Sequence, residues 1–236
     1  MRTNSSCKLF ICLLFSFILA SGSFVYSQSS SDTQTKESQS SITPEGVLKL
    51  LKEGHQRYLE GKMLNRNLIE QVKATASAQY PYAVVLNCLD SRVIPESVFD
   101  QGIGDIFDAR VAGNFVNDDI LGSMEFACKI TGAKLILVVG HTNCGAIKGA
   151  IDDAELGNLT QLLEKIKPAV ARTKYDGERT SKNLEFVDLV SKENVLMAIE
   201  NIKLKSPVLK EMLDKNEIMI AGCMYNISDG TVEFYK

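Results

Sequence analysis

Short apolar runs alternate with helical patterns along most of the chain. Between the later runs, apolar side chains recur at helical spacing over residues 121–130 and 159–171. Near-continuous Val, Ile and Leu strands separated by helices are typical of a mainly parallel β-sheet that helices cover on both faces, so we predict an α/β fold. The expected strands are residues 82–86, 106–111, 134–139 and 218–221.

Two further patterns mark the ends of the folded domain. A Thr-Pro pair at 43–44 suits the start of a helix, because threonine caps the first turn and proline fits inside it. An Asp-Gly pair at 229–230 predicts a tight turn, and the alternation over residues 231–235 predicts an edge strand after it. With no internal repeat and no second linker, residues 42–236 are interpreted as one domain.

The first residues have the pattern of a secretory signal peptide. Arg2 and Lys8 precede an apolar run at 9–20, which is too short to span a membrane. Small residues follow, and we predict that residues 1–27 are removed after Ser27. An uncleaved N-terminal anchor is the alternative.

A Ser-, Gln- and Thr-rich stretch follows the predicted cleavage site. Residues 28–41 hold little apolar area to bury, so we expect a disordered linker there. The mature protein is therefore expected to be exported, either to the periplasm or out of the cell, without a stable membrane anchor.

Composition narrows the function classes. The formal net charge is −3 and the pI is about 5.6, which argues against a nucleic-acid-binding surface because such domains are usually basic. The chain has 6 Cys and only 2 His, so each histidine matters for any metal or acid–base site.

Two strand ends hold the residues with chemistry. The first strand leads into Cys88, Asp90 and Arg92, and the third leads through Gly140 into a His-Thr-Asn-Cys-Gly segment at 141–145. Because binding sites in such sheets form beyond the carboxyl ends of the strands, neighbouring parallel strands would bring these segments together.

Thiolate and imidazole are ligands that zinc prefers, and a catalytic zinc site uses three protein ligands with one open position. Cys88, His141 and Cys144 supply that number, with two of them on one turn. We expect Gly140 and Gly145 to allow close approach of the backbone.

Each residue alone has a plainer explanation. A buried cysteine is usually a small apolar side chain, and an Asp-Arg pair can be a surface ion pair that contributes little. Export also permits disulfides, and the four mature cysteines allow three pairings. For Cys128 and Cys223 the expectation is burial in the reduced state, and for His55 a packing or surface role.

The two segments together resemble the signature of the β-class carbonic anhydrases. The resemblance includes residues 93–96, 112–114 and 225–230 and covers roughly residues 44–236. It implies that Cys88, His141 and Cys144 bind zinc, one ion per chain. It also implies that Asp90 and Arg92 form a catalytic dyad, with Asp90 as a conditional fourth zinc ligand.

The same resemblance implies the reaction and the pocket. The reaction would be the reversible hydration of carbon dioxide to bicarbonate and a proton, by attack of a zinc-bound hydroxide. Substrate would meet Gln79, Phe107, Phe126 and Gly145, where Phe126 stands in place of the usual tyrosine. A homodimer or homotetramer is implied, with the pocket near the dimer interface.

Two alternatives stay open at this point. One is a hydrolase of carbon disulfide or carbonyl sulfide, which would share the ligands and differ in access to the pocket. The other is a zinc-binding protein without turnover.

Overall fold

The structure, a computed structural model, describes residues 32–235. The predicted signal peptide at 1–27 and the linker residues 28–31 lie outside the described residues. Within the described range, no helix combines the length and the apolar composition that crossing a membrane requires.

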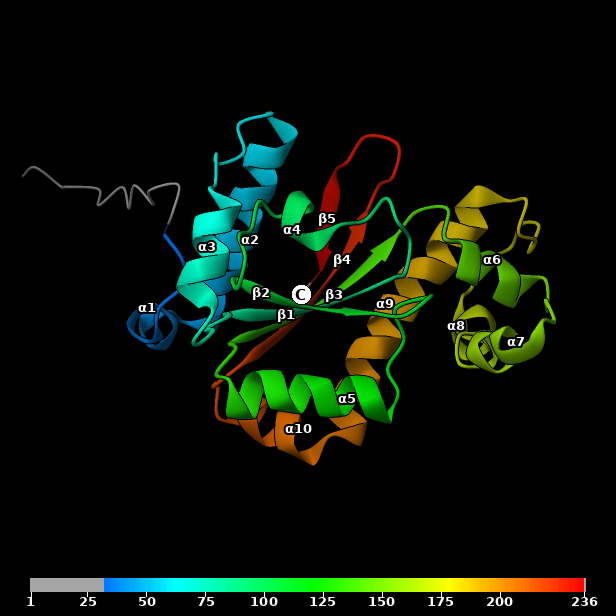
Figure 1. The fold of residues 1–236 in the computed structure, drawn as a ribbon. Helices are drawn as coiled ribbons and strands as arrows, with labels where there is room; N and C mark the ends of the chain where they lie inside the picture. The colour runs from blue at the N-terminus through cyan, green and yellow to red at the C-terminus, as the bar shows by residue number, and fades with distance from the viewer. Residues whose placement is uncertain (1–31, 236) are drawn as a thin grey trace, which may run out of the picture.

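A five-stranded sheet forms the centre of the domain, in the order β2-β1-β3-β4-β5. The first four strands are parallel, and the last is antiparallel at one edge, as the sequence predicted (Figure 1). Each expected apolar run is a strand, and the third and fourth extend further at their carboxyl ends than the apolar pattern suggested. The strands are β1 (Ala83–Asn87), β2 (Ile106–Arg110), β3 (Leu135–His141), β4 (Met219–Tyr225) and β5 (Val232–Tyr235).

Helices cover both faces of the sheet (Figure 1). Alternate residues of β1 point to opposite faces, so Val84 packs with one helical layer and Val85 with the other. One layer holds α2 (Pro44–Leu59) and α4 (Pro95–Val98), and α3 (Leu68–Thr75) leads into β1. The other holds α5 (Asp118–Glu125), the π-helix η1 (Phe126–Ile130), α9 (Leu184–Lys205) and α10 (Pro207–Asp214).

A third group of helices packs where the strands end. The helical pattern expected over 159–171 is two helices, because Pro168 has no N–H to donate and fits a first turn better than a helix interior. These helices enclose a separate core cluster that includes Cys88 and Cys144. They are α6 (Gly145–Ile151), α7 (Gly157–Glu164) and α8 (Lys167–Arg172).

The carboxyl end of the expected linker is ordered, which corrects the prediction for residues 36–41. They form α1 (Lys36–Ser41), which opens with a capping box at Thr35. Gln39 is 6% exposed and donates hydrogen bonds to Pro81 O (2.7 Å) and Thr131 O (2.9 Å). The stretch buries little apolar area, as expected, but these polar contacts attach it to the domain.

Helix α9 lies unusually close to the sheet. Cβ atoms added at Gly140 of β3 and Gly222 of β4 would lie 2.6 Å and 2.7 Å from methyl groups of Val195. Neither glycine could therefore be alanine without a shift of Val195 or of the backbone that carries it. The close approach of α9 matters below, because this helix also borders the candidate site.

Candidate metal centre

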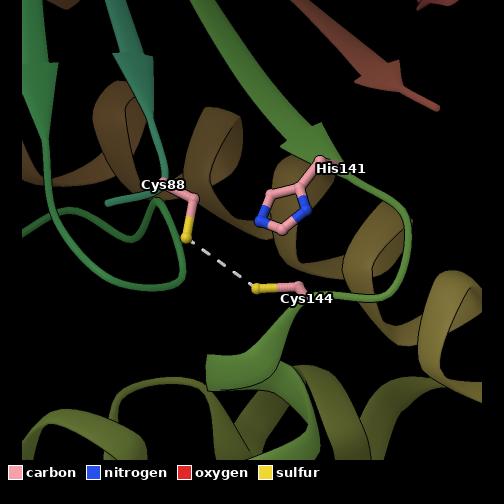
Figure 2. Close-up of side chains that lie close together, drawn as sticks. All are labelled: Cys88, His141 and Cys144. Atoms are coloured by element: carbon pink, nitrogen blue, oxygen red, sulfur yellow. Dashed lines mark hydrogen bonds between the residues drawn. The ribbon is translucent and has the colours of Figure 1, made fainter. Parts of the chain in front are cut away.

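Three predicted ligands meet at the carboxyl ends of β1 and β3. The two strands are adjacent and parallel, and Asn87 pairs with Val139 in register. Cys88 directly follows β1, His141 ends β3, and Cys144 lies on the next turn. Their ligand atoms lie within 4.8 Å of one another, and the two sulfur atoms are 3.9 Å apart (Figure 2).

The turn that carries two of the ligands is held from both sides. Thr142 N donates to Tyr225 O (3.0 Å), which ties the turn to β4. Asn143 has a φ of 55°, a left-handed conformation that asparagine tolerates better than most residues. Its N–H donates to Asp188 Oδ1 of α9 (2.7 Å). The turn therefore places His141 and Cys144 on the same side (Figure 2).

The ligand set fits zinc. His141 Nδ1 lies 2.9 Å from Thr142 O, so Nδ1 carries the proton and Nε2 offers its lone pair. That Nε2 atom is buried and has no hydrogen-bond partner among residues 32–235. Two sulfur atoms and one imidazole nitrogen, all buried, match the donors of a three-ligand zinc site.

The two cysteine sulfur atoms are hydrogen-bond partners, and this contact shifts their pKa values in opposite directions. A hydrogen bond from Cys144 holds the pKa of the Cys88 thiol well below its usual range, although burial opposes this. The same interaction with Cys88, together with burial, raises the pKa of Cys144. Gly113 N also donates to Cys88 Sγ at 3.3 Å. Cys88 is therefore the first of the two to become a thiolate, which is the form that binds metals.

Asp90 and Arg92 form a close pair beside the ligands. Arg92 donates to Asp90 Oδ1 from Nε (2.9 Å) and from its backbone N (3.0 Å), and to Oδ2 from Nη2 (2.6 Å). These bonds hold the pKa of the Asp90 carboxyl well below its usual range. Asp90 Oδ2 lies 3.8 Å from His141 Nε2, so the carboxylate faces the same volume as the free imidazole nitrogen.

One residue that supports the site was not identified from the sequence. Arg110, at the end of β2, donates to Asp90 O (2.7 Å), Val93 O (3.1 Å) and Cys88 O (3.3 Å). It therefore fixes the loop that carries Cys88 and Asp90. Arg110 is a charged residue at the end of the strand next to β1. That position is the signal that could have identified it.

Three predicted substrate residues lie away from the ligands within one chain. Gln79 is exposed before β1, at the opposite end of that strand from Cys88. Phe107 pairs with Val84, four residues before Cys88, which corresponds to about 13 Å along a strand. Phe126 is 51% exposed, and its ring lies 6.3 Å from that of Phe107. The single chain therefore does not bring these residues to the metal ligands.

The two glycines of the motif differ. Gly140 confirms the expected close approach, since an added Cβ there would meet Met224 Sδ at 2.6 Å. At Gly145 the single chain shows no close approach, since an added Cβ would meet no atom within 4 Å. Gly145 opens α6 on an exposed surface, so space within one chain does not require glycine there.

The remaining histidine and cysteines are packing residues. His55 is 6% exposed, and its Nδ1 lies 3.1 Å from Val98 O. Cys128 and Cys223 are buried and free, on opposite faces of the sheet, and burial raises the pKa of Cys128 to about 12. Among the residues that the structure describes, no cysteine forms a disulfide.

Comparisons with known proteins agree with this geometry. A sequence model of the carbonic anhydrase family matches residues 83–232. A carbonic anhydrase of Mycolicibacterium smegmatis is 34% identical over 196 residues, which cover 80% of this chain and 92% of that protein. Carbonic anhydrase 2 of Mycobacterium tuberculosis is 33% identical over 193 residues, with coverages of 79% and 90%. The solved β-carbonic anhydrase CcaA is similar at a TM-score of 0.64 and 26% identity, covering 80% of this chain and 88% of that one.

Proposed function

Because this chain belongs to the β-class carbonic anhydrase family, we propose that it catalyses the reversible hydration of carbon dioxide to bicarbonate and a proton, with one zinc ion per chain. Cys88, His141 and Cys144 would hold the ion. The observation that carries the proposal is the convergence of their ligand atoms within 4.8 Å in a buried position.

Zinc, when bound, lowers the pKa of a coordinated water so that hydroxide is available near neutral pH. The protein supplies two thiolates and one neutral imidazole, whose total charge of about −2 balances that of the ion. The ligand set therefore does not itself strongly repel an anionic product such as bicarbonate.

Asp90 is the proposed hydrogen-bond acceptor at the metal site. Its carboxylate would accept a hydrogen bond from the water or hydroxide that reacts with carbon dioxide. Two hydrogen bonds from the Arg92 guanidinium keep the carboxylate ionised and fix its orientation. For Asp90 to act as a fourth metal ligand, its side chain would have to turn away from Arg92. The three bonds from Arg92 favour the role of acceptor.

A homodimer or homotetramer would complete the pocket. The outer edge of β2 has no partner strand among residues 32–235, and such edges readily pair with another chain. Phe107 and Phe126 line a cavity of about 640 Å³ beside this edge. We therefore propose that Gln79, Phe107 and Phe126 reach the metal site of a second copy.

Mixing a chain that lacks a metal ligand with a chain that lacks Gln79 tests this assignment. A Cys88→Ser chain lacks one metal ligand but keeps Gln79. A Gln79→Ala chain keeps all three metal ligands but lacks the Gln79 side chain. If Gln79 acts across the interface, a mixed dimer contains one complete site, so activity should rise well above that of either variant alone. Activity equal to the average of the two separate variants would contradict the assignment.

The central experiment is a carbon dioxide hydration assay on purified protein of measured zinc content. We expect hydration activity that rises in proportion to zinc, up to about one ion per chain. Hydrolysis of carbon disulfide or carbonyl sulfide without hydration of carbon dioxide would contradict the proposed substrate. A fully active preparation without a transition metal would contradict the proposed cofactor.

A further inference from the structure

One hydrogen bond links α9 to the loop that contacts the Cys88 sulfur. Asn194 of α9 is fully buried, and its Nδ2 donates to Gly113 O at 2.7 Å. Gly113 N, in turn, donates to Cys88 Sγ at 3.3 Å. Gly113 has a φ of 80°, and an added Cβ there would meet Ile166 Cδ1 at 2.3 Å. Only glycine fits this position, and Asn194 holds it in the conformation that directs its N–H to a ligand.

A second hydrogen bond links the same helix to the other ligand segment. Asp188 Oδ1 accepts the N–H of Asn143 at 2.7 Å. Asn143 lies between His141 and Cys144 and has a left-handed backbone. Asp188 therefore supports the turn that spaces two ligands.

Helix α9 is a rigid base for both contacts. Asp188 and Asn194 are six residues apart, which corresponds to about 9 Å along a helix. Val190 lies between them and Val195 directly follows Asn194, and both valines are buried in the core. Because Val195 fills the space above the glycines of β3 and β4, the helix has little freedom to move relative to the strands.

The burial of Asn194 is poorly explained by stability alone. Its Oδ1 has no hydrogen-bond partner within the described part of the chain, so the buried amide makes its bond through Nδ2 only. An apolar side chain would avoid the cost of burying that oxygen but would leave Gly113 O without this donor. The polar contact that remains is directed at the loop whose N–H contacts the Cys88 sulfur.

We propose that Asp188 and Asn194 are positioning residues for zinc, through which one helix holds both ligand segments in register before the ion binds. The inference rests on the proposed function, since it assumes that zinc is the ion. Neither side chain is a ligand: Asn194 acts through Gly113 on Cys88, and Asp188 acts through Asn143 on the turn that carries the other two.

Zinc affinity, measured by competition with a chelator, tests the proposal without using activity. Asp188→Ala and Asn194→Ala should each weaken zinc binding by about 10- to 100-fold, the usual effect of losing an outer hydrogen bond to a ligand shell. Because the two contacts hold different loops, the double variant should weaken binding by about the product of the single effects. Cobalt-substituted Asn194→Ala should also show a shifted thiolate-to-metal absorption band.

Two matched controls separate positioning from packing. Ser191 lies on α9 between the two residues, is buried like Asn194, and bonds only to Val187 O of its own helix (2.9 Å), so Ser191→Ala should keep the wild-type zinc affinity. Asp188→Asn keeps an oxygen acceptor for Asn143 and should recover most of the affinity lost in Asp188→Ala. Thermal unfolding of the metal-free proteins shows that each variant is folded at the temperature of the titration.

Asp188 is only half-buried, so its variants remain informative if Asn194→Ala does not fold. Zinc affinities within about twofold of wild type in the folded alanine variants, with only the unfolding temperature lowered, would overturn the inference and leave the proposed function intact. A wild-type chain that binds no zinc would overturn both.

Discussion

Replacing Asp90 by Asn separates metal binding from catalysis. The substitution keeps the size of the side chain and removes its charge, so the reacting water loses its anionic hydrogen-bond acceptor. A positioned acid–base group contributes at least about 10²-fold to the rate, which is about 2.7 kcal/mol of transition-state stabilisation. We expect Asp90→Asn to keep its zinc and to lose at least about 10²-fold in kcat.

The effect on stability should be much smaller than the effect on rate. Arg92 is about half exposed, with 50% of its side chain accessible, and ion pairs of this kind contribute about 0–1 kcal/mol to folding. Arg92 holds the pKa of Asp90 below its usual range, so the stability from this pair is present above the unfolded pKa of about 4 and is lost as pH falls through the folded value. At neutral pH, the free energies of unfolding of wild type and Asp90→Asn should therefore differ by no more than about 1 kcal/mol.

Stopped-flow measurement of carbon dioxide hydration, on protein of known zinc content, gives the required rates. Arg92→Lys should also be slower with zinc retained, because lysine lacks the planar fork that contacts both carboxylate oxygens. If Arg92 acts only by positioning Asp90, the double variant should be little slower than Asp90→Asn alone. A folded, zinc-loaded Asp90→Asn protein with wild-type kcat would refute the dyad, even if the metal assignment survived.

Three other predictions concern the metal, the N-terminus and pH. Cys88→Ser, His141→Ala and Cys144→Ser should each lose most of the bound zinc, as measured by elemental analysis of folded protein; full retention in any one would remove that residue from the ligand set. Mass spectrometry of protein recovered from the native host should show an N-terminus about 20–30 residues beyond Met1, outside the cytoplasm; an intact Met1 on cytoplasmic protein would contradict export. Burial, with repulsion from a nearby acidic residue, raises the pKa of Asp108 to about 6, so the folded state loses stability as pH rises from about 4 to about 6. Because water partly screens this partly exposed residue, Asp108→Asn should stabilise the protein by only about 1–2 kcal/mol at pH 8 and have little effect at pH 4, as measured by denaturant unfolding; equal effects at both pH values would contradict this origin.

The sheet was predictable because its signal is local. Each apolar run contains enough Val, Ile and Leu to identify a buried strand, and the order of strands and helices implies parallel pairing. The position of the metal ligands then follows from a general property of such sheets, whose carboxyl ends gather the loops. Cys88 and His141 come from different strands, yet the pattern alone placed them together.

The parts that the sequence did not reveal depend on single contacts over long separations. Gln39 orders α1 through bonds to Pro81 and Thr131, which are 42 and 92 residues away. No composition rule anticipates such contacts, because a stretch rich in Ser and Gln has the same average properties whether or not one side chain finds a buried carbonyl.

The support of the metal ligands is the strongest example of this limit. The ligands are recognisable because zinc restricts the residue types that can bind it, so the chemistry leaves a pattern in the sequence. Asp188 and Asn194 act through backbone atoms, and any side chain with a suitable oxygen or N–H at the right place could do the same. Which positions of α9 can act is set by the path of that helix across the sheet, and the helix packs closely on Gly140 and Gly222. Positioning residues are therefore found by following hydrogen bonds outward from the ligands in three dimensions.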